Sequence, residues 1–569
     1  MASAGAGRAH QQRRNSVLGQ ANVRPGIEQF AQLYGLLAVL LRGAVLIFQT
    51  LTVGGIVFLL AVVWPARQEG ELVGEATLRW IQRWAWALST TIGLYVCLDG
   101  LVLMESSGLT VSEIVGANFV AAGILGAGAS LAVAILATKS RFHQRFDLLV
   151  PAIFILTAST MTSHSMARLE HRPLLALLTA LHQGATAAWI GGLPYLLIAL
   201  RYAPGAVTKQ ISARFSRLAM LSVSVLVGAG VALAFVYVRS ANAVYGTTYG
   251  FMVTAKVVLF GLLLALGGLN FRLIRRTPVF FLASLRRFGE AEIGIGFATV
   301  LLAASLTSLP PAVDTPQQSL QATAILARLA PHLPQVNAAP LRQFLLVSKM
   351  VSPEAANPAS GVSDSAVRQQ SWADSSAQEQ RWMDDPHHWA ALVVFPVGLL
   401  AFLARTKRGR WAQNWPLLFV GLGLVLLLLA DEQYWPLGHV SFWSSFLDPV
   451  VLPHRIIEAL IGIFGVFEWR VQTGRAVSAK VGLVFPMLMA VSSALLLTHV
   501  HSVANAGIQQ DLIPEFSHLA VAILGTLAGW SRWLELRLPS EDRTSRVMSW
   551  IWPACILVVG MVLAVYRES

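Results

Sequence analysis

The sequence predicts an all-α membrane protein, a polytopic bundle of transmembrane helices. Apolar residues make up 55% of the 569 residues and charged residues only 12%, against roughly 25% charged in soluble domains. Apolar runs of about twenty residues, long enough to cross a bilayer as a helix, recur along nearly the whole chain. A soluble enzyme of this size would have too few charges to cover its surface, so a lipid bilayer is the expected surrounding.

Hydropathy places about fourteen spans along the chain, eight in a first module and six in a second. They are expected near 35–64, 82–104, 115–137, 148–168, 174–200, 214–238, 249–272, 289–309, 388–404, 414–430, 451–469, 481–500, 513–533 and 549–566. The module boundaries divide the chain into a polar basic tail at 1–30, the eight-span module at 31–312, an external linker or small helical cap at 313–386, and the six-span, His-rich module at 387–569.

Basic residues alternate between the connecting loops, which predicts the orientation. Loops near 139–145, 201–217, 272–287, 405–410 and 470–480 are rich in Lys and Arg, whereas 239–248 and 431–450 are not. The basic loops belong in the cytoplasm, so both termini are expected outside, although the arginines of the tail favour the reverse. The net charge of +13 therefore indicates membrane topology, and no nucleic-acid partner is expected.

Several function classes are excluded by what the sequence lacks. The two cysteines, Cys97 and Cys555, lie in apolar runs and form no CxxC or CxxCH motif. No GxxxxGK[ST] loop is present, so a self-contained ATP-driven pump is not expected. No catalytic signature stands out, and the chain is not predicted to be an enzyme.

In the second module, imidazoles and carboxylates recur at the outer ends of three consecutive spans. Together they suit a divalent transition metal such as copper or zinc, and the candidate ligands are His454, Glu458, His499, His501, Glu515 and His518, with His439 of an outer loop as a possible addition. Two alternatives stay open. A histidine at a helix end is often just hydrogen-bonded to backbone, and His454 with His518 would also suit axial ligation of haem b.

The first module carries a second candidate set near the outer ends of its spans. His164 and His182 are the predicted ligands. Met161 and Met166, and Asp99 on the second span, are possible ligands, and a thioether beside imidazole favours copper over zinc. Glu290 and Glu292 open the eighth span and are expected to be solvated at the inner face.

The segment HQGATAAWIGGL at 182–193 resembles a motif of the copper resistance protein D (CopD) family of bacterial inner membranes. Further matching segments follow in order and cover roughly 35–312: Ser163-His164, RFSRLAM at 214–220, Tyr249-Gly250 leading to Lys256, Leu269-Asn270, and EAEIGIGFATVLLAASLTSLPPA at 290–312. The second module is similar to extensions fused to some family members.

The resemblance implies a multi-pass inner-membrane protein that transports or handles copper, with His/Met sites facing the periplasm. It also implies that His164 and His182 are associated with copper, and a periplasmic copper-binding protein is the expected partner. Two alternatives are a membrane redox protein that binds haem b, and an assembly factor for a copper enzyme that binds copper without translocating it.

Overall fold

The computed structural model describes residues 25–66, 71–139, 146–203, 205–276, 282–315, 320–323, 325, 387–406, 409–431, 433–448, 451–475, 478, 480–504 and 512–565. Helices dominate these residues, which contain no β-strand. Most of the tail at 1–30 and of the linker at 313–386 lies outside the described residues, so the expectations for those segments are not tested.

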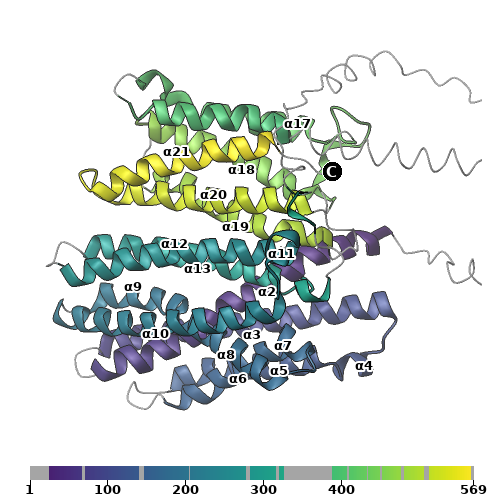
Figure 1. Cartoon of the computed structure of the whole chain (residues 1–569), viewed down its shortest axis with the longest axis vertical. Helices are drawn as coiled ribbons and strands as arrows, with labels where there is room; N and C mark the ends of the chain where they lie inside the picture. The colour runs from purple at the N-terminus through teal and green to yellow at the C-terminus, as the bar shows by residue number, and fades with distance from the viewer. Residues whose placement is uncertain are drawn as a thin grey trace, which may run out of the picture.

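In the first module, long helices alternate with short ones at the turns (Figure 1). Their bounds are α2 Pro25–Phe58, α3 Glu71–Ser107, α4 Val111–Val115, α5 Asn118–Lys139, α6 Leu149–Met161, α7 His164–Ala167, α8 Arg172–Thr186, α9 Leu193–Tyr202, α10 Gly205–Tyr237, α11 Ala241–Gly246, α12 Thr248–Arg276 and α13 Leu282–Leu306.

The second module contains the helix His387–Leu403, followed by α17 Leu417–Leu429, α18 Leu452–Gln472, α19 Val484–Ala504, α20 Leu512–Arg537 and α21 Arg543–Ala564. Across both modules, nine helices of the described part are long and apolar enough to cross a membrane, and three shorter apolar helices accompany them. The multi-pass helical fold is confirmed, and the count of about fourteen spans stays a prediction.

Helix α2 is the core helix of the first module. Within its apolar window 72% of the residues are buried, against 11% in that of α10, which lies at the periphery. Glycines let the segment after α8 approach α2 closely: a Cβ on Gly191 would lie 1.9 Å from the carbonyl oxygen of Thr50, and a Cβ on Gly54 would lie 2.2 Å from that of Ala187. The same segment widens into a π-helical turn at Ala187–Gly191, which carries Trp189.

The two modules pack where α2 and α13 of the first meet α19 and α20 of the second, at the middle of the molecule (Figure 1). Gly294 of α13 accommodates the ring of Trp530, because a Cβ there would lie 1.7 Å from the indole. The Ser305 hydroxyl donates to the carbonyl of Leu497 over 3.0 Å. Such close helix contact is typical of small residues at membrane-helix interfaces.

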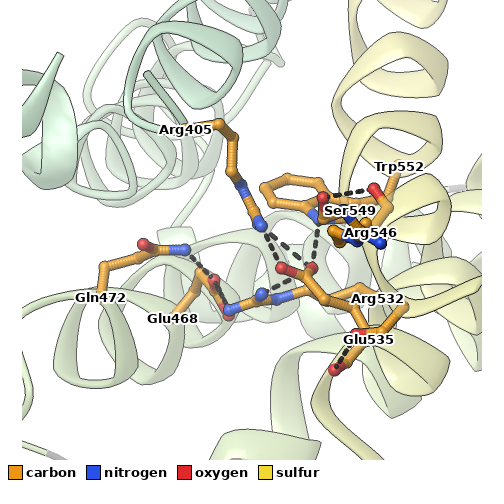
Figure 2. A network of polar contacts seen from close by, with 9 residues as sticks. Arg405, Glu468, Gln472, Arg532, Glu535, Arg546, Ser549 and Trp552 are labelled. Atoms are coloured by element: carbon orange, nitrogen blue, oxygen red, sulfur yellow. Dashed lines mark hydrogen bonds and ion pairs between the residues drawn. The ribbon is translucent and has the colours of Figure 1, made fainter. Parts of the chain in front are cut away.

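Buried charges hold the second module together (Figure 2). Arg532 of α20 pairs with Glu468 of α18 over 2.7 Å and with Glu535 over 2.7 Å. Arg405 also pairs with Glu535, and the indole Nε1 of Trp552 donates to the same carboxylate over 2.7 Å. The side chain of Glu468 is fully buried, so these pairs compensate charge that would otherwise be costly in the interior.

Candidate functional site

His164 lies at the start of α7, between α6 and α8, at the end of the bundle that also carries α4 and α11 (Figure 1). Its ring packs edge-on against Tyr237, the last residue of α10, with 6.2 Å between ring centroids. The Nε2 atom is buried and has no hydrogen-bond partner among the described residues. Burial lowers the pKa of His164, so the ring is neutral near pH 7 and can offer a lone pair to a metal ion.

Charged groups surround this imidazole. Arg168 pairs with Asp314 over 2.7 Å, and its guanidinium lies 5.7 Å from the centroid of the Tyr237 ring. Arg42 of α2 donates to the Thr162 hydroxyl over 3.0 Å. Asp314 thus balances the nearer arginine, which reduces the electrostatic cost of placing a cation beside His164.

His182 lies within α8 and faces α10. A Cβ on Gly230 would lie 3.4 Å from Cε1 of His182, so the glycine leaves space against that side of the imidazole. The Nδ1 atom is buried and has no hydrogen-bond partner among the described residues. Lys256 of α12 lies close enough to interact with it electrostatically. The structure thus places His164 and His182 on successive helices of one module, each with a buried nitrogen that makes no hydrogen bond within the described part.

The remaining first-module candidates flank these residues without completing a ligand set. Met161 ends α6 and Met166 lies in α7, both half-buried. Asp99 of α3 accepts a hydrogen bond of 2.7 Å from the Tyr34 hydroxyl. No group of three His, Cys, Asp or Glu side chains with metal-binding geometry occurs within the described ranges.

Deeper in the first module, three side chains from three helical segments form a buried polar cluster. Trp189 Nε1 donates to Oε1 of Glu292 over 2.9 Å, and Asn270 Nδ2 donates to Oε2 of the same carboxylate over 2.8 Å. Glu292 is only 2% exposed. The expectation that Glu292 is solvated is therefore wrong, because α13 turns this residue toward α12 and the π-helical turn instead of toward water.

In the second module, Glu458 and Arg455 are buried together at the start of α18. Arg455 donates to Glu458 over 3.2 Å and pairs with Asp431 over 2.8 Å. A metal ion at Glu458 would have to share its carboxylate with this guanidinium. His454 and His439 are both exposed on this part of the module.

His518 of α20 packs against His387, which opens the helix His387–Leu403, with 5.8 Å between the ring centroids. The side chains of His499, His501 and Glu515 lie outside the described residues. The predicted second-module metal set therefore stays a prediction.

The sequence reasoning missed two groupings that the structure brings together. His387 lies beside His518. The sequence feature that could have indicated it is the pair His387-His388 directly before an apolar run. Trp189, Asn270 and Glu292 each fall in a segment that carries the family resemblance, yet they are far apart in the chain and only the fold joins them.

Comparisons with known proteins agree with the resemblance. Residues 209–306, which include Asn270 and Glu292, match the family described as copper resistance protein D. The copper transport protein CutJ of Bacillus subtilis (strain 168) is 31% identical over 195 residues, which cover 33% of this chain and 35% of that protein, so the chain spans about a third of that relative's length. No solved structure matches. The predicted resemblance is confirmed at residues 209–306, where the chain matches the copper resistance protein D family.

Proposed function

We propose that this protein transports or hands on copper at a bacterial inner membrane, with its capture site facing the periplasm. The observation that carries the proposal is the pair His164 and His182, each with a buried ring nitrogen that makes no hydrogen bond within the described residues. Both lie in the module whose residues 209–306 match the copper resistance protein D family. A buried imidazole nitrogen normally has a partner, and neutral imidazole is a common copper ligand.

The orientation rests on charge. Arg201 ends α9, and Lys209 and Arg214 lie in the first turns of α10, at the end of the bundle opposite α7 and α11 (Figure 1). A basic end is expected in the cytoplasm. His164 at the other end then faces the periplasm, where a copper-binding protein would deliver the ion.

Polar side chains continue from His164 into the interior. Arg42 and Gln49 lie two turns apart on α2, and Gln49 donates to Gln183, the residue after His182, over 3.4 Å. Buried polar groups in a membrane interior are costly and mark ion pathways. We therefore propose that copper moves from His164 to His182 and onward along the face of α2. The predicted ligands of the second module would form a separate site.

The same residues also suit an assembly factor that binds copper without translocating it. No finding favours haem b: in the described part His518 stacks edge-on with His387, and His454 is exposed.

The test is metal content and an optical spectrum of the full chain purified in detergent after loading with copper. The variants are His164→Asn with His182→Asn, and His499→Ala with His501→Ala for the second module. His171→Asn is the matched control, because His171 is exposed and has a positive φ of 54°, which Asn tolerates.

We expect copper bound to wild type and to His171→Asn, and lost from the first double variant. Copper-loaded vesicles then separate transport from binding, because only a transporter moves the ion across the bilayer. Equal copper in wild type and in the first double variant would refute the first-module site. A Soret band without copper would refute copper handling in favour of haem.

A further inference from the structure

Glu292 is a carboxyl group in the interior of the first module that is held by neutral donors alone. Its two oxygens accept from the indole of Trp189 over 2.9 Å and from the amide of Asn270 over 2.8 Å. At 2% exposure the residue has almost no access to solvent. Counting 1.5 Å per residue, it lies about 12 Å along α13 from Ser284, where the apolar span begins.

The charged and titratable groups on the elements packed against α13 make contacts elsewhere. On α2, Arg42 bonds to Thr162, and on α9 the Tyr195 hydroxyl bonds to the carbonyl of Leu51 while Arg201 stacks on Tyr202. On α12, Lys256 interacts electrostatically with His182 and Arg272 is exposed, while the side chains of Arg275 and Arg276 lie outside the described residues.

On α20 and α13 the contacts are likewise directed away from Glu292. Arg537 and Trp533 reach Glu290, two residues earlier on α13, which Arg287 also holds over 2.7 Å. On α19, the side chains of His499 and His501 lie outside the described residues. Within the described residues, therefore, Glu292 forms no ion pair with an arginine, lysine or histidine.

An ionised carboxylate buried without a counter-charge is very costly, so it binds a cation or is neutralised by a proton. Two N–H donors aimed at both oxygens leave a metal cation poorly placed there, because each donor hydrogen carries partial positive charge. A proton has no such conflict, provided that the resulting O–H finds an acceptor.

Asn270 supplies that acceptor. Its Oδ1 is buried and has no hydrogen-bond partner among the described residues, while its Nδ2 donates to Oε2. A half-turn of the amide exchanges the two atoms, so the same side chain donates to the ionised carboxylate and accepts from the protonated one. Trp189 can only donate, and it holds the other oxygen in both states.

We propose that Glu292 is a proton-binding site and that the amide of Asn270 hydrogen-bonds to it in both protonation states. We further propose that the proton of Glu292 is exchanged for copper passing through the first module. As the cation enters, the carboxyl group of Glu292 releases H⁺ to water. When the cation leaves, the carboxylate takes up H⁺ again, so charge is balanced in both directions. The coupling rests on the proposed copper function, whereas proton binding by Glu292 does not.

The first experiment uses the full chain without copper. Infrared difference spectra across a pH titration are compared for wild type, Glu292→Gln and the matched control Glu290→Gln. We expect a protonated-carboxyl band that disappears as the pH rises, present in wild type and in Glu290→Gln, and absent in Glu292→Gln. Identical titrations of wild type and Glu292→Gln would overturn the proposal.

Asn270→Leu is a second test in case Glu292→Gln does not fold. It keeps the carboxyl group of Glu292 and removes only the amide that contacts it. The band should persist in Asn270→Leu, shift to higher frequency because the O–H loses its acceptor, and disappear at higher pH because the carboxylate loses a donor. An unshifted band with an unchanged titration would refute the role of Asn270.

Coupling is then measured by adding copper to unbuffered protein with a pH-sensitive dye. Wild type and Glu290→Gln should release protons, and Glu292→Gln should bind copper with that release lost. Equal proton release from Glu292→Gln would overturn the coupling. Absence of copper binding in wild type would instead refute the proposed function and leave the infrared result standing.

Discussion

The indole of Trp189 and the carboxylate of Glu292 are joined by a hydrogen bond of 2.9 Å, although 103 residues separate them in the chain. The bond ties the π-helical turn after α8 to the middle of α13. It thereby connects the glycine-rich motif of the family resemblance with the segment that matches the family.

Trp189→Phe should lower the free energy of unfolding in detergent by about 1–3 kcal/mol, because it leaves one oxygen of a buried carboxylate without a donor. Trp533→Phe is the matched control: it removes a 3.2 Å indole bond to Glu290, which keeps Arg287 and Arg537. The control should lower the free energy of unfolding clearly less than Trp189→Phe does. Thermal unfolding of both variants checks the prediction, and equal losses would contradict it.

Gly294→Ala should separate the two modules or destabilise the whole chain, because the new Cβ would meet the ring of Trp530. Gly261→Ala of α12 is the control: nothing lies within 4 Å of its Cβ position, and it should be neutral or stabilising by about 0.5–1 kcal/mol. A specific protease site inserted between the modules, cleaved and followed by gel filtration, reports whether the modules stay together. The double variant Gly294→Ala/Trp530→Ala should restore their association. Continued association in Gly294→Ala would show that the helices shift to absorb the methyl group.

Arg532→Met should destabilise the second module by about 3–5 kcal/mol, because the fully buried carboxylate of Glu468 loses its ion pair and keeps only the neutral amide of Gln472. The carboxylate of Glu535 would lose less of its stabilisation, because Arg405 and Trp552 still bind it. Adding Glu468→Gln to Arg532→Met should recover much of the loss, whereas Arg79→Met, which breaks an exposed 3.8 Å pair with Glu75, should change little. Denaturant titration provides the measurement. A failure of Glu468→Gln to rescue would assign the cost to packing.

Stability should fall in acid because of His164. Burial holds its pKa in the folded state below the unfolded value of about 6.5. A depressed pKa contributes stability that is present above pH 6.5 and is lost as the pH falls through the folded pKa, where the unfolded state binds more protons. The melting temperature of wild type should therefore drop more between pH 7.5 and about pH 5 than that of His164→Asn. His171→Asn should behave like wild type, and parallel curves for all three proteins would contradict the prediction.

Hydropathy alone was sufficient for the helical membrane fold. A chain in lipid must satisfy its backbone hydrogen bonds within each helix, so apolar length is a local property that the sequence displays directly. The charged helices α18 and α20 were expected as spans, and their charges are neutralised by partners such as Arg455 with Glu458 and Arg532 with Glu468. Arg455 and Glu458 are three residues apart, so helix geometry alone could have predicted their pairing. The sequence pattern instead favoured Glu458 as a metal ligand.

The sequence by itself determined the many apolar helices, the copper family resemblance and the pair His164 and His182 as candidate ligands, because each depends on residue type and local spacing. Only the tertiary structure decided that Glu292 faces the interior with Trp189 and Asn270, and that Gly294 makes room for Trp530. The physical reason is helix rotation. Which face of α13 meets α12, the π-helical turn or α20 is set by packing between segments far apart in the chain, which no local pattern reports.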